Sequence, residues 1–236
     1  MPLSAQYSVV VPAAGVGKRM KADNPKQYLH IAGKTVIEHT LNNLLAHNQI
    51  KRVIVALNPS DTLFAHLPVA SDPRVDTVIG GQERSDSVLA GLNYLPSNEA
   101  WVLVHDAARP CFKATDLTAL LQLVNHNICG GLLATPVRDT MKRAVNITAD
   151  NHMFVKQTES RENLWHALTP QFFKLELLKK ALDLANAQQV TITDEASAME
   201  LLGEKIALIK SSPANIKITE PEDLMLAEFY LNQKTN

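Results

Sequence analysis

The chain lacks the features that mark several common protein classes. It holds only two cysteines in 236 residues, Cys111 and Cys129, and their spacing favours neither a disulfide framework nor a zinc site. We therefore expect both thiols to be small buried hydrophobic groups. No apolar run reaches the length of a membrane span, and residues 1–8 lack the basic and apolar regions of a signal peptide. The sequence thus predicts a cytoplasmic protein without a membrane partner.

An excess of charge and several catalytic motifs are also missing. The formal net charge is −1, which argues against a protein that coats nucleic acid. The histidines form no H-x-x-x-H pair with a carboxylate, and no Gly-x-Ser-x-Gly motif occurs, so metal-centred hydrolysis and acyl transfer are disfavoured. The hydrophobic fraction of 46% is enough for a full core.

Short apolar runs alternate with amphipathic patterns along the chain. Such alternation predicts a Rossmann-like α/β fold, a doubly wound and mostly parallel sheet with helices on both faces. The expected strands are residues 7–12, 52–57, 77–79, 101–105, 131–135, 206–209 and 215–218. Helices are expected after a capping box at Thr35, at 85–95, after a Thr115 cap, at 176–188, at 194–202 and after a second capping box at Thr219.

Residues 138–163 break this rhythm because they are polar and longer than a connection in a compact domain needs to be. Two β-like patches, residues 140–144 and 153–157, flank a turn-prone centre at 148–151. We expect a protruding β-hairpin arm. Since an isolated hairpin is only marginally stable, we expect the arm to pack on a second subunit. The alternative is a mobile surface loop, which would leave several apolar side chains in water.

The loop after the first strand, from Ala13 to Met20, contains Gly15 and Gly17 and gathers cations. It lacks the third glycine of a dinucleotide fold and the spacing of a P-loop. A loop that wraps a nucleotide triphosphate, with Arg19 and Lys26 as clamps, remains the favoured interpretation. The competing interpretation is a tight turn with solvated lysines.

Three further segments carry polar groups at positions where an α/β sheet binds ligands. Residues 80–87 offer glycines and hydroxyls, which fit a ligand or ordinary helix capping. Asp106, beyond an apolar strand, can bind a hydroxyl or help to hold a cation, directly or through water, or simply pair with Arg109. Residues 166–171 and 191–195 each place hydroxyls at the start of a helical pattern, and Lys217 is a cation on a late strand.

Eight segments, in this order, resemble the 2-C-methyl-D-erythritol 4-phosphate cytidylyltransferase family of the non-mevalonate isoprenoid pathway. They are VVPAAGVGKRM, NPKQYL, GGQERSDSV, VHDAARP, PVRDTMKR, LWHALTPQ, TITDEASA and NIKITEPEDL. The resemblance implies one nucleotidyltransferase domain over residues 1–236, with the arm at 138–163 inserted in it. It also implies transfer of CMP from CTP to the sugar-alcohol phosphate, with release of pyrophosphate. One departure is Ala214, where the family often has an acidic residue.

The resemblance also implies a role for individual residues. Four would act in catalysis: Arg19, Lys26, Arg161 and Lys217. The nucleotide would be held by Pro12, Ala13, Ala14, Gly15, Gly17, Gly81, Gln82 and Ser87. The acceptor would be held by Asp106, Arg109, Thr140, Thr169 and Thr193, with Arg109, Thr140 and Arg161 reaching across a homodimer interface through the arm. Mg²⁺ would accompany the triphosphate, with Asp106 as its candidate ligand.

The residue types fit this reaction independently. A phosphomonoester is largely ionised at pH 7, since its second pKa is about 6, and it needs little help from a general base. The site must instead align two polyanions and supply positive charge. The alternatives are a cytidylyltransferase for another polyol phosphate, such as ribitol 5-phosphate, and a nucleotide-binding module without turnover. A redox dinucleotide enzyme is disfavoured by the missing third glycine.

Overall fold

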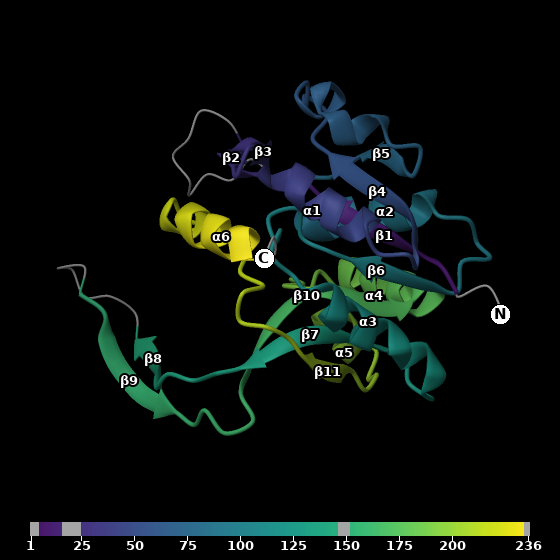
Figure 1. Cartoon of the computed structure of the whole chain (residues 1–236). Helices are drawn as coiled ribbons and strands as arrows, with labels where there is room; N and C mark the ends of the chain where they lie inside the picture. The colour runs from purple at the N-terminus through teal and green to yellow at the C-terminus, as the bar shows by residue number, and fades with distance from the viewer. Residues whose placement is uncertain (1–4, 16–24, 146–151, 234–236) are drawn as a thin grey trace.

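The computed structural model describes residues 5–15, 25–145 and 152–233. Its centre is a seven-stranded sheet in the order β11-β7-β10-β6-β1-β4-β5 (Figure 1). The strands are β1 (Tyr7–Pro12), β4 (Ile50–Leu57), β5 (Val75–Ile79), β6 (Trp101–Val104), β7 (Gly130–Pro136), β10 (Trp165–Lys174) and β11 (Ala207–Lys210). All neighbours run parallel except β10, which is antiparallel to β6 and β7. The predicted doubly wound, mostly parallel sheet is confirmed.

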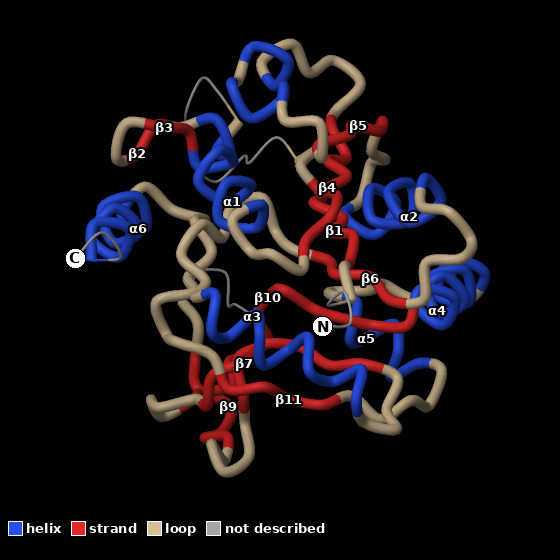
Figure 2. Tube along the Cα trace, turned by 45° about the vertical axis from the view of Figure 1, so that its right-hand side comes forward, coloured by secondary structure: helices blue, strands red, loops and turns tan. Residues whose placement is uncertain are grey.

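Both faces of the sheet are covered because its central strands are apolar on both sides. Val9 and Val11 of β1 lie in one buried cluster, to which α1 (Val36–Leu45) and α3 (Ala114–Leu121) contribute leucines. Val10 faces the other side, toward α2 (Arg84–Tyr94), α4 (Leu175–Ala187) and α5 (Glu195–Leu201). Figure 2 shows α1 and α2 on opposite sides of β1 and β4.

Two hairpins and one helix lie outside this sandwich. The strands β2 (His30–Ile31) and β3 (Lys34–Thr35) form a short hairpin before α1, and α6 (Glu222–Gln233) packs beside it. The strands β8 (Met141–Val145) and β9 (Phe154–Glu159) pair antiparallel and project from the sheet (Figure 1). The predicted hairpin arm is therefore confirmed, while its predicted turn at 148–151 lies outside the described residues.

Two predicted elements were wrong. Residues 166–171 were expected to start a helix, but they belong to β10, and α4 begins only at Leu175. Residues 215–218 were expected to be a strand, but they form a loop. The Ile216 and Ile218 side chains pack in a third cluster with α6 instead of in the sheet.

Helix boundaries were close to prediction, while some caps differ. Thr35 and Glu38 form the expected capping box of α1. The N-cap of α3 is Lys113 instead of Thr115. Before α6 the Asp223 carboxylate, and not that of Glu222, accepts hydrogen bonds from the Thr219 and Glu220 backbone N–H groups. Both cysteines are buried, as expected. Among the described residues, no helix has the length and apolar character required to cross a membrane.

Candidate active site

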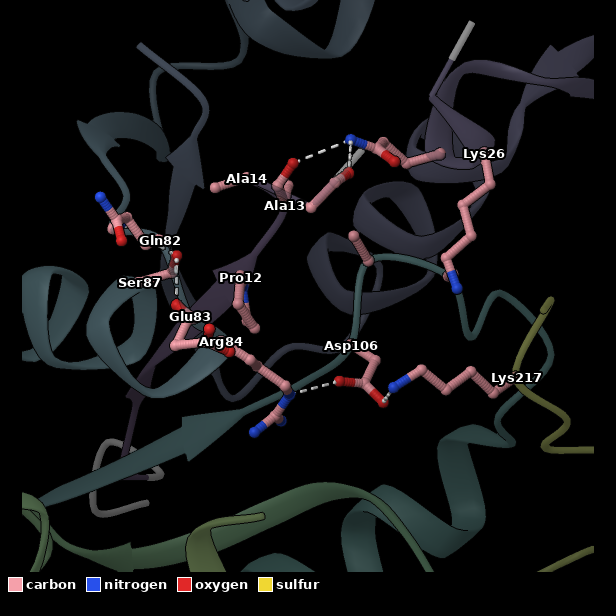
Figure 3. Close-up of a pocket in the computed structure, with 15 residues that line it drawn as sticks. Pro12, Ala13, Ala14, Lys26, Gln82, Glu83, Arg84, Ser87, Asp106 and Lys217 are labelled. Atoms are coloured by element: carbon pink, nitrogen blue, oxygen red, sulfur yellow. Dashed lines mark hydrogen bonds and ion pairs between the residues drawn. The ribbon is translucent and has the colours of Figure 1, made fainter. Parts of the chain in front are cut away.

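The loop that leaves β1 lines a pocket at the carboxyl edge of the sheet. The Gln27 side chain braces this loop, because its amide Nε2 donates to the Ala13 carbonyl at 2.8 Å and to the Gly15 carbonyl at 3.2 Å (Figure 3). Gln27 is 4% exposed, so it is a fixed support. The predicted nucleotide ligand Gly17 and the predicted catalytic Arg19 lie in residues 16–24, outside the described residues.

A second loop, between β5 and α2, forms the facing wall of the pocket. A Cβ on Gly80 would lie 2.8 Å from the Ala14 Cβ and 2.8 Å from the Ser87 Oγ, so only glycine permits the two loops to approach this closely. The Gly81 N–H donates to the Ser87 hydroxyl at 3.2 Å, and that hydroxyl donates to the Glu83 carbonyl at 3.2 Å. Ser87 thus fixes the shape of the loop that precedes it.

Every predicted nucleotide contact within the described residues lines this one pocket. These residues are Pro12, Ala13, Ala14, Gly15, Gly81, Gln82 and Ser87. The parallel strands β1 and β5 bring them together from positions that are almost seventy residues apart, since both strands end at the same edge of the sheet. The pocket lies beside the point where the chain crosses from one side of β1 to the other, the usual ligand position in such folds.

The Asp106 carboxylate sits at the base of this pocket and is paired with three cations. Its Oδ1 accepts from the Arg84 Nε at 3.0 Å, and its Oδ2 lies 3.2 Å from the Arg109 Nε and 3.0 Å from the Lys217 Nζ. Burial alone would raise the pKa of Asp106, but the charges of Arg84, Lys217 and Arg109 hold that pKa well below its usual range. Asp106 is therefore ionised at neutral pH.

Two lysines from distant parts of the chain line the same pocket as this carboxylate. The Lys26 Nζ donates to the Ile218 carbonyl at 2.7 Å, next to the residue that carries the second lysine. In Figure 3 the ammonium groups of Lys26 and Lys217 point into the same part of the pocket. The arrangement concentrates positive charge beside the two glycine-containing loops, where an anionic ligand is favoured.

On the far side of Asp106, the Thr169 hydroxyl forms hydrogen bonds with other groups of the protein. Its Oγ1 accepts from the Asp106 N–H at 3.0 Å and lies 3.0 Å from the His105 Nδ1. Burial lowers the pKa of His105 to about 4, so its ring is neutral at pH 7. Its Nε2 then donates to the Arg109 carbonyl at 3.0 Å while its Nδ1 accepts the Thr169 hydroxyl proton. This chain of hydrogen bonds fixes the backbone on both sides of Asp106.

A second pocket adjoins the first and contains the predicted acceptor ligands except Thr140, together with Lys217. Asp106, Arg109, Thr169, Thr193 and Lys217 line it. Arg84, Asp106 and Lys217 belong to both pockets. The site can therefore hold two ligands side by side across a shared positive cluster, which suits a reaction between two anionic molecules.

The described residues do not supply a protein cage for a metal ion. No group of three or more His, Cys, Asp or Glu side chains is placed to hold one in that part of the chain. Both oxygens of Asp106 already accept from cations. Because three positive charges surround this one carboxylate, a further divalent cation is electrostatically disfavoured beside it, and the role of Asp106 as a Mg²⁺ ligand stays a prediction.

Known proteins of one family match nearly the whole chain. The sequence model of the 2-C-methyl-D-erythritol 4-phosphate cytidylyltransferase family (IspD) matches residues 7–233. The chain belongs to this family. A cytidylyltransferase of that name from Pseudoalteromonas atlantica is 58% identical over 234 residues, 99% of each chain. One from Photorhabdus laumondii is 54% identical, over 98% of this chain and 97% of the relative. The crystal structure of the Francisella tularensis enzyme matches with a TM-score of 0.80 at 32% identity, over 96% of this chain and 100% of that one.

The arm residues of this cytidylyltransferase family member lie apart from its two pockets. Thr140 and Arg161 are exposed at the base of the arm and line neither pocket. The Arg161 guanidinium donates to the Arg138 carbonyl. Arg109, which the sequence grouped with these two, is instead buried beside Asp106 of its own chain and donates to the Asn215 carbonyl at 2.8 Å. Arg109 therefore lies in the site of its own chain.

Sequence reasoning missed a set of buried or half-buried polar side chains that support the site. They are Gln27, Arg84, His105, Gln171, Glu195 and Asn215. Each contacts a residue between 4 and 111 positions away, and most of these contacts are too distant to read from local spacing. The available signal was their place inside the motifs, next to the residues that were singled out.

Proposed function

We propose that this chain transfers a cytidylyl group from CTP to 2-C-methyl-D-erythritol 4-phosphate, forming 4-diphosphocytidyl-2-C-methyl-D-erythritol and pyrophosphate. Membership of the cytidylyltransferase family over residues 7–233 supports this reaction. The single structural observation that carries it is the pair of adjoining pockets, which share Arg84, Asp106 and Lys217. Two anionic substrates can occupy these pockets with their reacting groups at the shared boundary.

The chemistry is a direct displacement at the α-phosphorus of CTP. An oxygen of the acceptor phosphate forms the new P–O bond, and the bond from the α-phosphorus to the bridging oxygen of the β-phosphate breaks. The leaving pyrophosphate takes the electron pair, and no proton moves in this step. Because the attacking oxygen is already ionised at neutral pH, the protein contributes alignment and charge.

We propose that the cationic side chains among the described residues supply this positive charge. Lys26 and Lys217 neutralise the α-phosphoryl group in the transition state, together with Arg19, which lies outside the described residues. The backbone of Ala13 to Gly15 and the loop from Gly81 to Ser87 hold the nucleotide. Asp106, Arg109, Thr169 and Thr193 position the acceptor, whose hydroxyls can donate to the Asp106 carboxylate.

Our proposal for Mg²⁺ leaves out the protein ligand, Asp106, that the sequence suggested. Mg²⁺ would enter with the triphosphate and neutralise its charge, and the triphosphate oxygens would be its ligands instead of Asp106. This follows from the three cations already bound to Asp106. Mutation of Asp106 to asparagine is then expected to leave the Mg²⁺ concentration for half-maximal rate unchanged, even where it lowers that rate.

We further propose that two subunits share the site through the arm. Four apolar side chains of the arm, Val145, Met153, Phe154 and Val155, are 40 to 72% exposed in the single chain. A partner would bury them. The exposed Thr140 and Arg161 at the base of the arm could then reach the partner's acceptor pocket. Residues 1–236 would act as one domain with this arm inserted, and the cytoplasmic location stays a prediction that cell fractionation tests.

Pyrophosphate release distinguishes the proposed function from its alternatives. The purified chain is mixed with CTP, Mg²⁺ and either 2-C-methyl-D-erythritol 4-phosphate or ribitol 5-phosphate. We expect release with the methylerythritol phosphate and a much lower kcat/KM with ribitol phosphate. A higher kcat/KM with ribitol phosphate would favour the related enzyme. CTP binding without release in either mixture would favour the non-catalytic module.

A further inference from the structure

Arg84 connects the two halves of the site and has no role in the function described so far. It is the first residue of α2, directly after the loop that lines the nucleotide pocket. Its Nε donates to the Asp106 Oδ1 at 3.0 Å, and its two terminal nitrogens reach the Glu195 Oε1 at 2.6 Å and Oε2 at 3.0 Å. Three of the five N–H groups of the guanidinium thus donate to two carboxylates, in one bidentate and one single contact.

The burial of Glu195 indicates that its contact with Arg84 is an integral part of the fold. Its side chain is 1% exposed, and the Arg84 guanidinium is its ion-pair partner among the described residues. A buried carboxylate without a paired cation is strongly disfavoured. Burial would lower the pKa of the Arg84 guanidinium, yet the charges of Glu195 and Asp106 raise it, so Arg84 carries its positive charge. Glu195 therefore depends on Arg84 for its charge balance.

The pair also fixes the start of α5, which forms part of the acceptor pocket. Glu195 is the first residue of that helix, and Thr193 lies two residues before it. From the other side, Gln171 of β10 donates to the Asp194 Oδ2 at 2.8 Å and accepts from the Ala196 N–H at 2.8 Å. Arg84 and Gln171 together hold the turn that carries Thr193. Arg84 is thus connected to Asp106 directly and to the Thr193 turn through Glu195.

We propose that Arg84 and Glu195 form a positioning pair. The pair holds Asp106 and the turn that carries Thr193 at fixed positions relative to the nucleotide loop, and in this way it determines how tightly the acceptor binds. This inference rests on the proposed function, because it concerns the acceptor side of the same site. Arg84 acts through Asp106 and Glu195 instead of through a phosphate, since each of its three nitrogens already donates to one of these carboxylates. It touches neither reacting group in this account.

Steady-state kinetics of Glu195→Gln test the proposal. Glutamine keeps the size of the side chain and one acceptor but loses the charge that orients Arg84. We expect the KM for 2-C-methyl-D-erythritol 4-phosphate to rise on the order of tenfold, the cost of one charge-assisted hydrogen bond, with the KM for CTP within about twofold of wild type. If Arg84 instead bound the triphosphate, freeing it from Glu195 would leave the acceptor KM unchanged and change the KM for CTP; that result would overturn the proposal.

The conservative variant Arg84→Lys separates geometry from charge. Lysine retains the positive charge but cannot bridge two carboxylates with a planar fork. We expect Arg84→Lys to raise the acceptor KM as much as Arg84→Met does. Rescue of the acceptor KM by lysine would contradict a positioning role and indicate that charge alone matters.

A matched control exists at the opposite edge of the sheet. Glu99 is 7% exposed, accepts from the Ser8 N–H at 3.1 Å and pairs with Lys51 at 2.8 Å, far from either pocket. Glu99→Gln is expected to lower the thermal midpoint without moving either KM. An equal rise of the acceptor KM in Glu99→Gln would show that the Glu195 effect is general destabilisation.

One measurement is independent of the substrate. A double-mutant cycle on the free energy of unfolding, with Arg84→Met and Glu195→Leu, reports the contact itself. We expect a larger coupling than for Lys51→Met with Glu99→Leu. If the cycle shows coupling but no acceptor supports turnover, the proposed function fails while the contact stands. If the cycle shows no coupling, the proposed positioning pair is wrong, whichever substrate the enzyme uses.

Discussion

At the scale of single residues, Lys26 is the cation whose loss should affect the chemical step most. Its ammonium group is held at the Ile218 carbonyl and points into the nucleotide pocket. Removing one preorganised charge from a transition state of this kind costs on the order of 10²-fold in kcat or more. We therefore expect Lys26→Ala to lower kcat at saturating CTP by that factor, as measured by pyrophosphate release.

The control for this variant is Lys34→Ala. Lys34 is an exposed lysine on the neighbouring strand β3, and it lines neither pocket of the site. Its loss should leave kcat unchanged. Near-normal turnover of Lys26→Ala would show that the assigned role is wrong.

His105 predicts how stability depends on pH. Its pKa falls from 6.5 to about 4 on burial, so between these values the unfolded chain binds a proton that the folded chain does not. Stability must then rise with pH over this window, by on the order of 3 kcal/mol in total, and it is lost as pH falls from 6.5 to 4. We expect urea unfolding of His105→Gln to show a shallower rise than wild type over that range.

The exposed His126 provides the comparison for His105. His126→Gln should keep the wild-type slope of unfolding free energy against pH. An unchanged slope in His105→Gln would mean that another group titrates in this window, with the buried His47, whose pKa is also lowered by burial, as the next to examine.

The sequence predicted the residues that a ligand would touch better than those that hold them in place. Asp106, Lys217 and the two nucleotide loops could be predicted because each stands at the end of a strand or inside a recognisable motif. The supports could not, because a buried Gln27 or Glu195 looks like any surface residue in sequence. Only the fold brings Arg84 to a partner 111 positions away.

At the scale of elements, we expect the N-terminus of α5 to contribute both to the stability of the fold and to acceptor binding. Asp194 is its N-cap, and its carboxylate accepts from the Ser197 N–H at 2.9 Å and from Gln171 at 2.8 Å. We expect Asp194→Ala to lower the free energy of unfolding by about 1 kcal/mol and to raise the KM for the acceptor, because Thr193 lies beside the cap. Urea unfolding and steady-state kinetics measure the two effects.

Thr35→Ala is the matched change at another helix. Thr35 caps α1, and its hydroxyl accepts from the Glu38 N–H at 3.3 Å. This variant should lose a similar free energy of unfolding without a change in either KM. A normal acceptor KM in Asp194→Ala would remove α5 from the account of acceptor binding.

The two elements predicted wrongly have different physical causes. The segment from Trp165 to Lys174 contains Thr169 and Pro170, and its pairing with β7 is interrupted between Ala167 and Gln171, so it lacks a regular strand pattern. The segment 215–218 has strand-like alternation because Ile216 and Ile218 bury against α6. Alternation reports burial on one side, and a loop under a helix produces it as well as a strand does.

At the scale of the whole molecule, the arm predicts a shared site. An Arg161→Ala chain is mixed with a Lys26→Ala chain under conditions that exchange subunits. If Arg161 acts across a dimer, each mixed dimer contains one complete site, and activity should recover to about a quarter of the wild-type value per chain. No recovery in dimers that have exchanged would place Arg161 in the site of its own subunit.

The exposed apolar face of the arm gives the accompanying test of assembly. Phe154 is 55% exposed in the single chain, and Phe154→Asp would place a charge where a partner buries apolar surface. We expect light scattering to give the mass of a monomer for this variant and of a dimer for wild type. Met225→Asp on α6, at a site 71% exposed, should leave the mass unchanged. A wild-type monomer would contradict the shared site.

The central claim is that an oxygen of the acceptor phosphate attacks CTP directly in a site that supplies charge and alignment. Rapid-quench measurement of pyrophosphate, with the enzyme preloaded with CTP and Mg²⁺, tests it. The account predicts no release until 2-C-methyl-D-erythritol 4-phosphate is added, and then one pyrophosphate for each acceptor consumed. A burst equal to the enzyme concentration without acceptor, or no release after its addition, would contradict it.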